Sequence, residues 1–144
     1  MSKRLPTSAV RVIDANANRA LEGLRVCEEI IRLHLGTRTA FRASRALRHA
    51  VGQAIRTLPI TPTDRVRARD SRTDLGRAAS TTPVDSLERL LLINFQRAKE
   101  SLRTLEECSR LVAPRQTVSF QRLRFRTYEV ERAVLLRVAA LRHH

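Results

Sequence analysis

The amino-acid sequence predicts an all-α protein, a four-helix bundle built from two helical hairpins and a long central crossover. Ala, Leu and Arg dominate the 144 residues, and all three favour helices. Clusters of β-branched residues bounded by turn residues are missing, and only four glycines occur. A chain of this length can bury a core as one domain over residues 1–144 without disulfides or metal.

The first hairpin is predicted over residues 8–58. Its first helix is expected to begin with Thr7 or Ser8 as N-cap and to end at Gly36, a residue that commonly stops helices. The second helix is expected over residues 38–55. Apolar residues recur in steps of three and four along the first helix and predict one buried stripe: Ile13, Ala17, Ala20, Leu24, Cys27 and Ile31.

A crossover over residues 59–82 follows, longer than an ordinary connection in a bundle, and connections of this length are often functional or disordered. Three arginines alternate with two aspartates in its centre, and Gly76 permits a turn there. Guanidinium groups bind phosphate oxygens and carboxylates bind Mg²⁺, so this composition suits a phosphate with its metal ion. The alternative is a solvated loop whose charges neutralise one another. The five charged residues are Arg67, Arg69, Asp70, Arg72 and Asp74.

The second hairpin is predicted over residues 83–141. Its first helix is expected to have Thr82 as N-cap and Pro83 at the first helical position, and to end at Pro114. The buried stripe of this helix is predicted as Val84, Leu87, Leu91, Phe95, Ala98, Leu102 and Leu105. The last helix is expected over residues 119–141, with these residues facing inward: Leu123, Val130, Val134, Val138 and Leu141.

The two hairpins share a repeated stretch, which predicts an internal pseudo-two-fold. "DANANRALEGLRVCEEIIRL" at 14–33 and "LINFQRAKESLRTLEECSRL" at 92–111 have Asn, Arg-Ala, Glu, Leu-Arg, Glu-Glu and Arg-Leu in common. A helix turns by about 100° per residue, which places several repeated residues along one flank of each apolar stripe. They are Asn16, Arg19 and Gly23 in the first copy and Asn94, Arg97 and Ser101 in the second.

This flank predicts a small-molecule site between helices, where bundle proteins build such sites. The alternative is intrahelical ion pairing, such as Glu22 with Arg25 and Glu100 with Arg103. Ion pairing is favoured for the repeated Glu-Glu pairs at 28–29 and 106–107. A ligand is favoured for the repeated Asn and Arg, because Asn lowers helix propensity without adding a charge pair.

The formal charge of +14 comes from 26 arginines and two lysines against 14 acidic residues. A surface this basic attracts nucleic acid, anionic lipid or phosphorylated metabolites, although a biased coding composition would also enrich arginine. The few aromatic residues argue against a stacking platform for single strands. Nucleic-acid binding therefore remains an alternative function.

The cysteines and the N-terminal residues carry further expectations. Cys27 and Cys108 form no CxxC pair and have no His at a metal-binding interval, so both are expected to be reduced and buried. The N-terminal residues lack the apolar segment of a signal peptide, and no stretch is long enough to span a membrane. A cytoplasmic protein without membrane contact is expected.

Five motifs together resemble a known family. "R-x-I-D-A-N-x-N-R-A-x-E-G-L-R-V-x-E-E" stands at 11–29, "LRH" at 47–49, "RD…DLG" at 69–76, "N-x-x-R-A-x-E-S-L-R-x-L-E-E" at 94–107 and "R-x-x-x-Y-E" at 124–129. In this order they resemble the hydroxymethylpyrimidine-phosphate kinase-like helical domain of thiamine biosynthesis, which is often fused ahead of thiamine-phosphate synthase. The resemblance covers nearly the whole chain.

The resemblance implies a phosphotransferase that converts hydroxymethylpyrimidine phosphate to the diphosphate with ATP and Mg²⁺. The accepting phosphate oxygen is already ionised, so the site has to supply alignment and positive charge rather than a strong base. No glycine-rich phosphate loop of the GxxxxGK[ST] or GxGxxG type is present, which leaves this task to arginines. A non-catalytic domain that binds the pyrimidine phosphate and partners thiamine-phosphate synthase is the alternative.

The expected site combines the repeated flank with the crossover. The catalytic candidates are Arg19 and Arg97, which contact phosphate, and Asp70. The substrate-binding candidates are Asn16, Asn18, Asn94, Glu22, Arg69, Arg124 and His49, the last of which could equally be a buried hydrogen-bonded histidine. The Mg²⁺ candidates are Asp74, Asp70 and Asp14. Expected partners are the phosphorylated pyrimidine, a nucleotide, thiamine-phosphate synthase and a second copy of the chain, because a bundle with few aromatics can bury further apolar surface in a homodimer.

Overall fold

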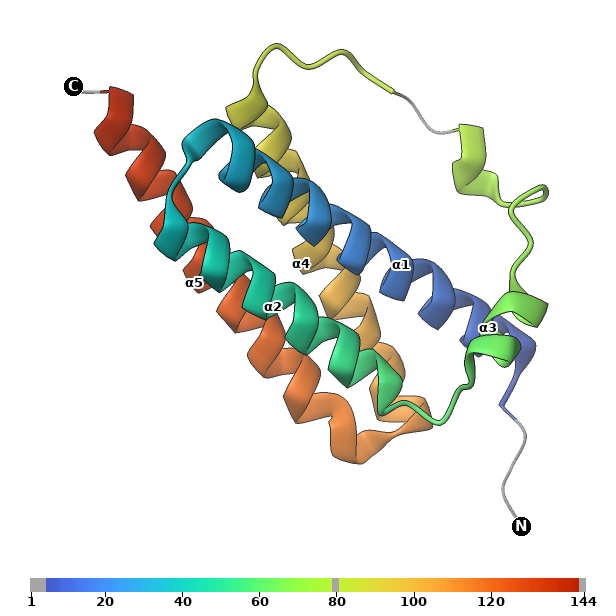
Figure 1. The fold of residues 1–144 in the computed structure, drawn as a ribbon. Helices are drawn as coiled ribbons and strands as arrows, with labels where there is room; N and C mark the ends of the chain where they lie inside the picture. Colours follow the sequence, from blue (N-terminus) through green and yellow to red (C-terminus); the bar gives the residue numbers. More distant parts are fainter. Residues whose placement is uncertain (1–4, 79–80, 143–144) are drawn as a thin grey trace.

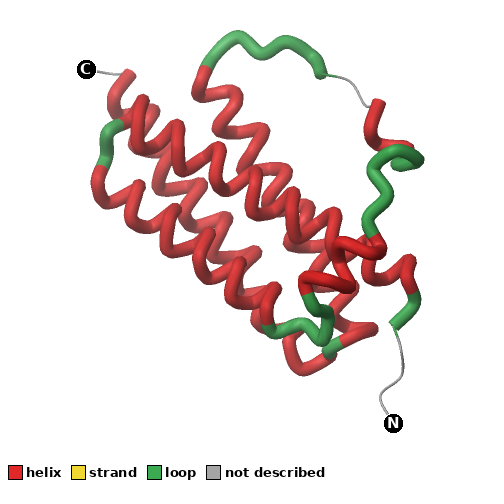
Figure 2. Tube along the Cα trace, turned by 45° about the vertical axis from the view of Figure 1, so that its right-hand side comes forward, coloured by secondary structure: helices red, strands yellow, loops and turns green. Residues whose placement is uncertain are grey.

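A computed structural model describes residues 5–78 and 81–142, and the regular structure within these ranges is entirely helical (Figures 1 and 2). The long helices are α1 (Thr7–Ile30), α2 (Arg38–Arg56), α4 (Leu87–Val112) and α5 (Thr117–Arg142). A short helix, α3 (Pro62–Ala68), lies in the crossover. A π-helical turn at Ile31–Leu35 extends α1, and 3-10 turns occur at Leu75–Ala78 and Pro114–Gln116. The predicted all-α bundle is confirmed.

The four long helices pack in a ring (Figure 1). α1 contacts α2 and α4, and α5 contacts the same two helices from the other side, so each hairpin packs against the other. α3 packs against α1. One continuous core fills the ring, and the six residues of the first predicted stripe are all buried in it.

Three predicted helix boundaries are wrong. The residue that caps α1 is Pro6, and the helix begins at Thr7, so neither Thr7 nor Ser8 is the N-cap. α4 begins at Leu87 behind Ser86, whose hydroxyl accepts a hydrogen bond from the Arg89 backbone N–H at 3.0 Å. The last helix begins two residues before the predicted Ser119. For α4 the side-chain cap that forms at Ser86 sets the start, whereas α1 begins after Pro6 without a side-chain cap.

The outer ends of two predicted stripes are also wrong. Val84 and Leu87 precede or open α4 and are 37% and 43% exposed, while Leu141, at the end of α5, is 45% exposed. The residues between these ends are buried as predicted. Helical periodicity continues past the length over which a partner helix is available, so it overestimates burial at the ends.

Glycines mark one helix end and one close helix contact. Gly36 has a φ of 65°, the left-handed conformation that an L side chain resists, and it stops the first helix as predicted. A Cβ on Gly23 would lie 3.0 Å from the backbone oxygen of Asn94, so α1 and α4 come together closely at this point. The small residue at the predicted seam therefore has a packing role.

Two ion pairs connect the hairpin partners at corresponding places. Glu28 of α1 is 2% exposed and accepts hydrogen bonds from Arg48 of α2, with Nε at 3.2 Å. Glu106 of α4 is 6% exposed and accepts from Arg124 of α5, with Nε at 2.9 Å. Because a buried carboxylate needs a charged or hydrogen-bonded partner, these pairs fix the side-by-side position of the helices in each hairpin.

Among the described residues, no helix is both long enough and apolar enough to cross a membrane.

Candidate functional site

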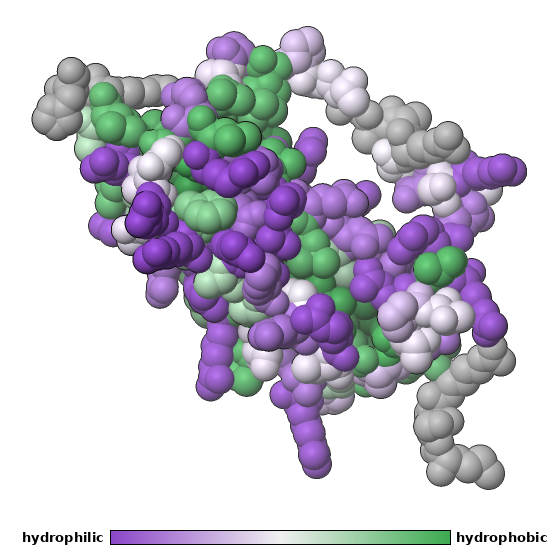
Figure 3. Space-filling view, in the orientation of Figure 1, coloured by the Kyte–Doolittle hydropathy of each residue, from purple (hydrophilic) through white to green (hydrophobic). Residues whose placement is uncertain are grey.

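Two adjoining hollows open along α1, each with a volume of about 680 Å³, which is within the usual size for a small-molecule pocket. The crossover hollow lies between the first half of α1 and the crossover, and its lining includes Arg11, Asp14, Asn18, Arg69, Asp70, Ser71 and Asp74. The helix hollow lies between α1 and α4. Asn16, Arg19 and Glu22 line both, so one row of α1 side chains forms the common wall. Hydrophilic side chains are abundant along α1 and the adjoining crossover (Figure 3).

The helix hollow is lined by residues that recur at the 78-residue offset of the repeated sequence. Its ten lining residues form five pairs: Asn16 with Asn94, Arg19 with Arg97, Glu22 with Glu100, Gly23 with Ser101, and Val26 with Thr104. The first three pairs are identical, and the last two replace Gly and Val by residues that carry hydroxyl groups. The structure thus brings the predicted polar flanks of the two helices into one hollow.

Arg19 and Arg97 are exposed and, among the described residues, form no ion pair or side-chain hydrogen bond. Most other arginines of α1 and α4 differ in this respect, since Arg25, Arg103 and Arg110 pair with glutamates of their own helices. The side chain of Arg19 also reaches the crossover, because its Nη2 lies 3.5 Å from the position of a Cβ on Gly76. Two guanidinium groups are therefore available to an anion in the helix hollow.

Asn16 and Asn94 each use their amide nitrogen within their own helix. Nδ2 of Asn16 donates to the Val12 carbonyl at 2.9 Å, and Nδ2 of Asn94 donates to the Leu90 carbonyl at 2.8 Å. The amide orientation is thereby set, and the side-chain oxygen remains as an acceptor. The pair offers acceptors for the N–H groups of a ligand.

Asp70 and Asp74 hold the crossover in two consecutive turns. The Asp70 carboxylate accepts from the Thr73 hydroxyl at 2.6 Å and from the Thr73 backbone N–H at 3.3 Å, and these bonds keep the pKa of Asp70 below its usual range. The Asp74 carboxylate accepts from the Gly76 backbone N–H at 2.8 Å. Both carboxylates line the crossover hollow and retain lone pairs, since each oxygen can accept more than one bond.

Asp14, predicted as a Mg²⁺ ligand, is bound to two arginines in the structure. Both oxygens of this buried carboxylate are occupied by Arg65 and Arg69, with Nε atoms at 2.8 and 2.9 Å. Burial opposes ionisation of Asp14, but the hydrogen bonds from the two arginines outweigh it and lower its pKa. Two further candidates share this cluster: Asn18 accepts from Arg65 at 2.9 Å, and Arg69 uses two of its nitrogens on Asp14.

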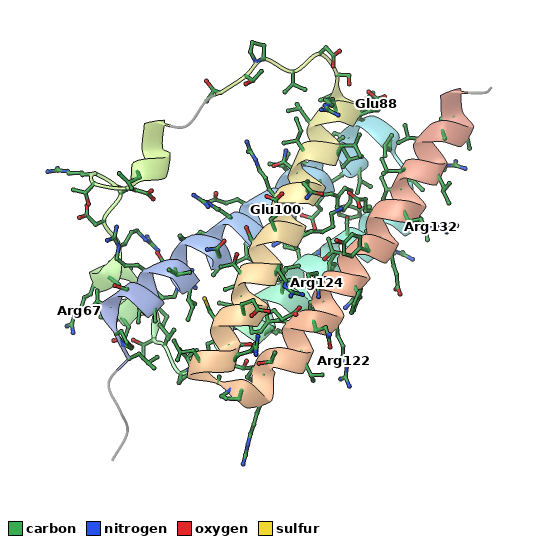
Figure 4. All side chains as sticks on the ribbon, turned by 180° about the vertical axis from the view of Figure 1, so that it is seen from behind. Arg67, Glu88, Glu100, Arg122, Arg124 and Arg132 are labelled. Atoms are coloured by element: carbon green, nitrogen blue, oxygen red, sulfur yellow. The ribbon has the colours of Figure 1, made fainter. Side chains whose placement is uncertain are left out.

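His49 and Arg124, two predicted substrate-binding residues, lie outside both hollows. His49 is an exposed residue of α2, and its ring nitrogen is 3.5 Å from the guanidinium of Arg48. Arg124 pairs with Glu106, and this carboxylate raises the pKa of the Arg124 guanidinium. The Cζ atom of Arg124 also lies 4.9 Å from the centroid of the Phe125 ring. Figure 4 shows Arg124 between α4 and α5, whereas Glu100 lies where α4 crosses α1. In the structure Arg124 thus connects α4 and α5, and His49 lies beside Arg48 on the surface of α2.

The described residues contain no preformed metal cluster. No three His, Cys, Asp or Glu side chains of the described residues gather into a metal cluster. A Mg²⁺ ion is often held by only one or two carboxylates together with substrate phosphates. Asp70 and Asp74 could provide these carboxylates.

The two cysteines have no feature of a reactive thiol. Cys27 is buried and Cys108 half-buried, and burial raises the pKa of both thiols. Neither is activated as a nucleophile.

Several lining residues were not predicted as site residues from the sequence. Glu100 and Thr104 line the helix hollow, and their repeat offset from Glu22 and Val26 is the signal that would have identified them. Arg11 lines the crossover hollow and donates to the Asp70 backbone oxygen at 3.3 Å. Nothing in its local sequence marks this contact.

Comparisons with known proteins show to which family the chain belongs. Thiamine-phosphate synthase of Synechocystis sp. is 35% identical over 138 residues, which cover 94% of this chain and 38% of that protein. The proteins of the same name from Gloeobacter violaceus and Nostoc sp. are 34% and 33% identical, covering 85% and 90% of this chain but 35% and 36% of their own. The chain thus spans little more than a third of these relatives. No solved structure matches it. The model of the ThiD2 family matches residues 11–133, so this chain, a domain of thiamine biosynthesis, belongs to the ThiD2 family.

Proposed function

We propose that this chain is an ATP-dependent kinase that phosphorylates hydroxymethylpyrimidine phosphate to the diphosphate. One observation carries the proposal: Arg19 and Arg97, at equivalent places in the repeat, line the same hollow without carboxylate partners among the described residues. Unpaired guanidinium groups in a polar hollow suit a phosphate, which they bind through charge-assisted hydrogen bonds. Membership of the ThiD2 family supports the thiamine pathway as the context.

The two hollows suit two phosphorylated ligands that meet at a shared wall. The helix hollow supplies Arg97, two asparagine oxygens and two hydroxyl groups, which suit the phosphate and the amino group of an aminopyrimidine. The crossover hollow supplies Asp70 and Asp74, which suit a nucleotide that carries Mg²⁺ on its phosphates. Arg19 lines both hollows, so it is placed to contact the group that passes between the two ligands.

The proposed reaction needs little acid-base chemistry. An oxygen of the pyrimidine monophosphate attacks the γ-phosphorus of ATP, the bond from that phosphorus to the β-γ bridging oxygen breaks, and ADP leaves. The attacking oxygen is already ionised, so the chain has to align the reactants and stabilise charge on the transferred group. Arg19 and Arg97 would do this from opposite sides of the helix hollow. Bound Mg²⁺, held by Asp70 and Asp74, would neutralise charge on the nucleotide phosphates.

A coupled assay tests the proposal. The chain is incubated with ATP, Mg²⁺, the pyrimidine monophosphate and a separately purified thiamine-phosphate synthase with its thiazole substrate, and thiamine phosphate is measured. Product is expected only when ATP and the chain are both present, and Arg19→Ala should reduce its rate at least 100-fold. No ATP-dependent product at high concentrations of the chain would refute kinase activity.

A second candidate is a non-catalytic domain that binds the pyrimidine phosphate for a synthase. The observation that favours it is that the relatives are named thiamine-phosphate synthase and match this chain over about a third of their length. This candidate predicts that the pyrimidine monophosphate binds the chain while the coupled assay yields no product from ATP. Calorimetry with the monophosphate, run beside the assay, separates the two functions.

A further inference from the structure

Asp14 forms the densest polar contact between α1 and the crossover. The carboxylate is 3% exposed and accepts three hydrogen bonds: from Arg65 Nε at 2.8 Å, from Arg69 Nε at 2.9 Å and from Arg69 Nη2 at 3.0 Å. Arg65 also donates to the Asn18 side-chain oxygen at 2.9 Å. One buried carboxylate thus holds two arginines that lie 51 and 55 residues further along the chain.

These contacts continue into the wall of the crossover hollow. Arg65 lies in α3, and Arg69 directly precedes Asp70, whose backbone oxygen accepts a hydrogen bond from Arg11 of α1. The Asp70 carboxylate then binds Thr73 and so shapes the turn that leads to Asp74. The place of both crossover carboxylates therefore depends on where Asp14 holds Arg69.

The bundle core has no comparable dependence on Asp14. The core cluster consists of residues of the four long helices, the π-helical turn and Leu58, and it includes no residue of α3. Release of Arg65 and Arg69 would therefore free the crossover from α1 while the long helices stay packed. This separates a role in the site from a role in the fold.

We propose that Asp14 is a positioning residue, which holds Arg65 and Arg69 so that Asp70 and Asp74 stay opposite Arg19 in the phosphate site. The inference rests on the proposed function in one respect, that this hollow binds the phosphates of a ligand. Asp14 would act through Arg65 and Arg69, to which both of its oxygens are hydrogen-bonded.

The test uses the full chain with Asp14→Asn and Arg65→Met. Arg65 does not line either hollow, so any loss of ligand affinity in Arg65→Met cannot come from a lost ligand contact. Calorimetry measures the binding of magnesium pyrophosphate. The rate of tryptic cleavage after the exposed Arg67 and Arg72 measures how firmly the crossover is attached to the bundle. The melting midpoint in circular dichroism shows whether the bundle is intact. Asp85→Asn is the matched control, because Asp85 is an exposed residue between the crossover and α4 and lies outside both hollows.

Both variants are expected to bind magnesium pyrophosphate about tenfold more weakly and to be cleaved in the crossover at least tenfold faster, with the melting midpoint within about 3 °C of the wild type. The control should match the wild type in all three measurements. Wild-type affinity in both variants, or loss of the helical bundle in both, would overturn the proposal. A wild-type chain that does not bind magnesium pyrophosphate would overturn it too, whereas a failed coupled assay with intact pyrophosphate binding refutes only the kinase.

Discussion

Replacing Arg97 by Ala is expected to weaken binding of the pyrimidine monophosphate about 10- to 100-fold with almost no effect on folding. Arg97 is exposed and, among the described residues, has no carboxylate partner, so its removal leaves no unpaired buried charge. A charge-assisted hydrogen bond contributes roughly 1.5–3 kcal/mol, and about 1.4 kcal/mol corresponds to a tenfold change in affinity. An exposed substitution changes the free energy of unfolding by about 0.5 kcal/mol or less, or about 2 °C in Tm.

The assay is isothermal titration calorimetry with the pyrimidine monophosphate, together with thermal unfolding of the same samples. Arg110→Ala is the matched control, because Arg110 lies on the same helix, is 67% exposed in its side chain and pairs with Glu107 outside the hollow. The control should lose neither affinity nor more than about 2 °C. If Arg97→Ala binds like the wild type but unfolds at a clearly lower temperature, the arginine is structural and the phosphate site is misplaced.

Three further changes test other parts of the structure. Gly23→Ala should destabilise the fold by about 1–3 kcal/mol in urea unfolding, because its Cβ would lie 3.0 Å from the Asn94 backbone oxygen and push α1 from α4; unchanged stability would contradict the close helix contact. His49→Ala should leave affinity for the monophosphate unchanged in calorimetry, since His49 lies outside both hollows; a tenfold loss would restore it to the site. The pKa of Asp14 is lowered on folding from 3.8, so near this pH the unfolded state binds more protons than the folded state. The stability that Asp14 contributes is therefore present above about pH 4 and is lost on acidification. Urea titrations between pH 5 and 3 should therefore show a smaller loss for Asp14→Asn than for the wild type, and equal losses would argue against the ion pair.

Much of the helix hollow could be predicted from local sequence. The apolar steps of three and four place the buried stripe on one side of each helix, and the position of a polar residue relative to that stripe follows from helix geometry. Asn16, Arg19, Asn94 and Arg97 therefore appeared on matching flanks before any packing was known, and the structure places all four in one hollow. Their roles in binding and catalysis stay predictions.

The crossover shows what the same reasoning missed. Helix α3 has a recognisable start, since Thr61 and Asp64 form a capping box with Pro62 at the first helical position, but seven residues carry too little periodicity to predict a helix. Arg65 was not expected to have a role. Asp14 is predicted as a Mg²⁺ candidate, and its contact with Arg65 and Arg69 could not be predicted because these arginines lie more than 50 residues away.

The sequence by itself determined the helical class, the core stripes and the flanks that carry the repeated polar residues, because these depend on contacts within a few turns of one helix. The tertiary structure alone decided which charges meet: Asp14 with Arg65 and Arg69, Glu28 with Arg48, and Glu106 with Arg124. These partners lie 18 to 55 residues apart, and helix packing selects them from many arginines of equal chemistry. Arg19 and Arg97 are candidates for a ligand because that packing places both in one hollow and pairs neither with a described carboxylate.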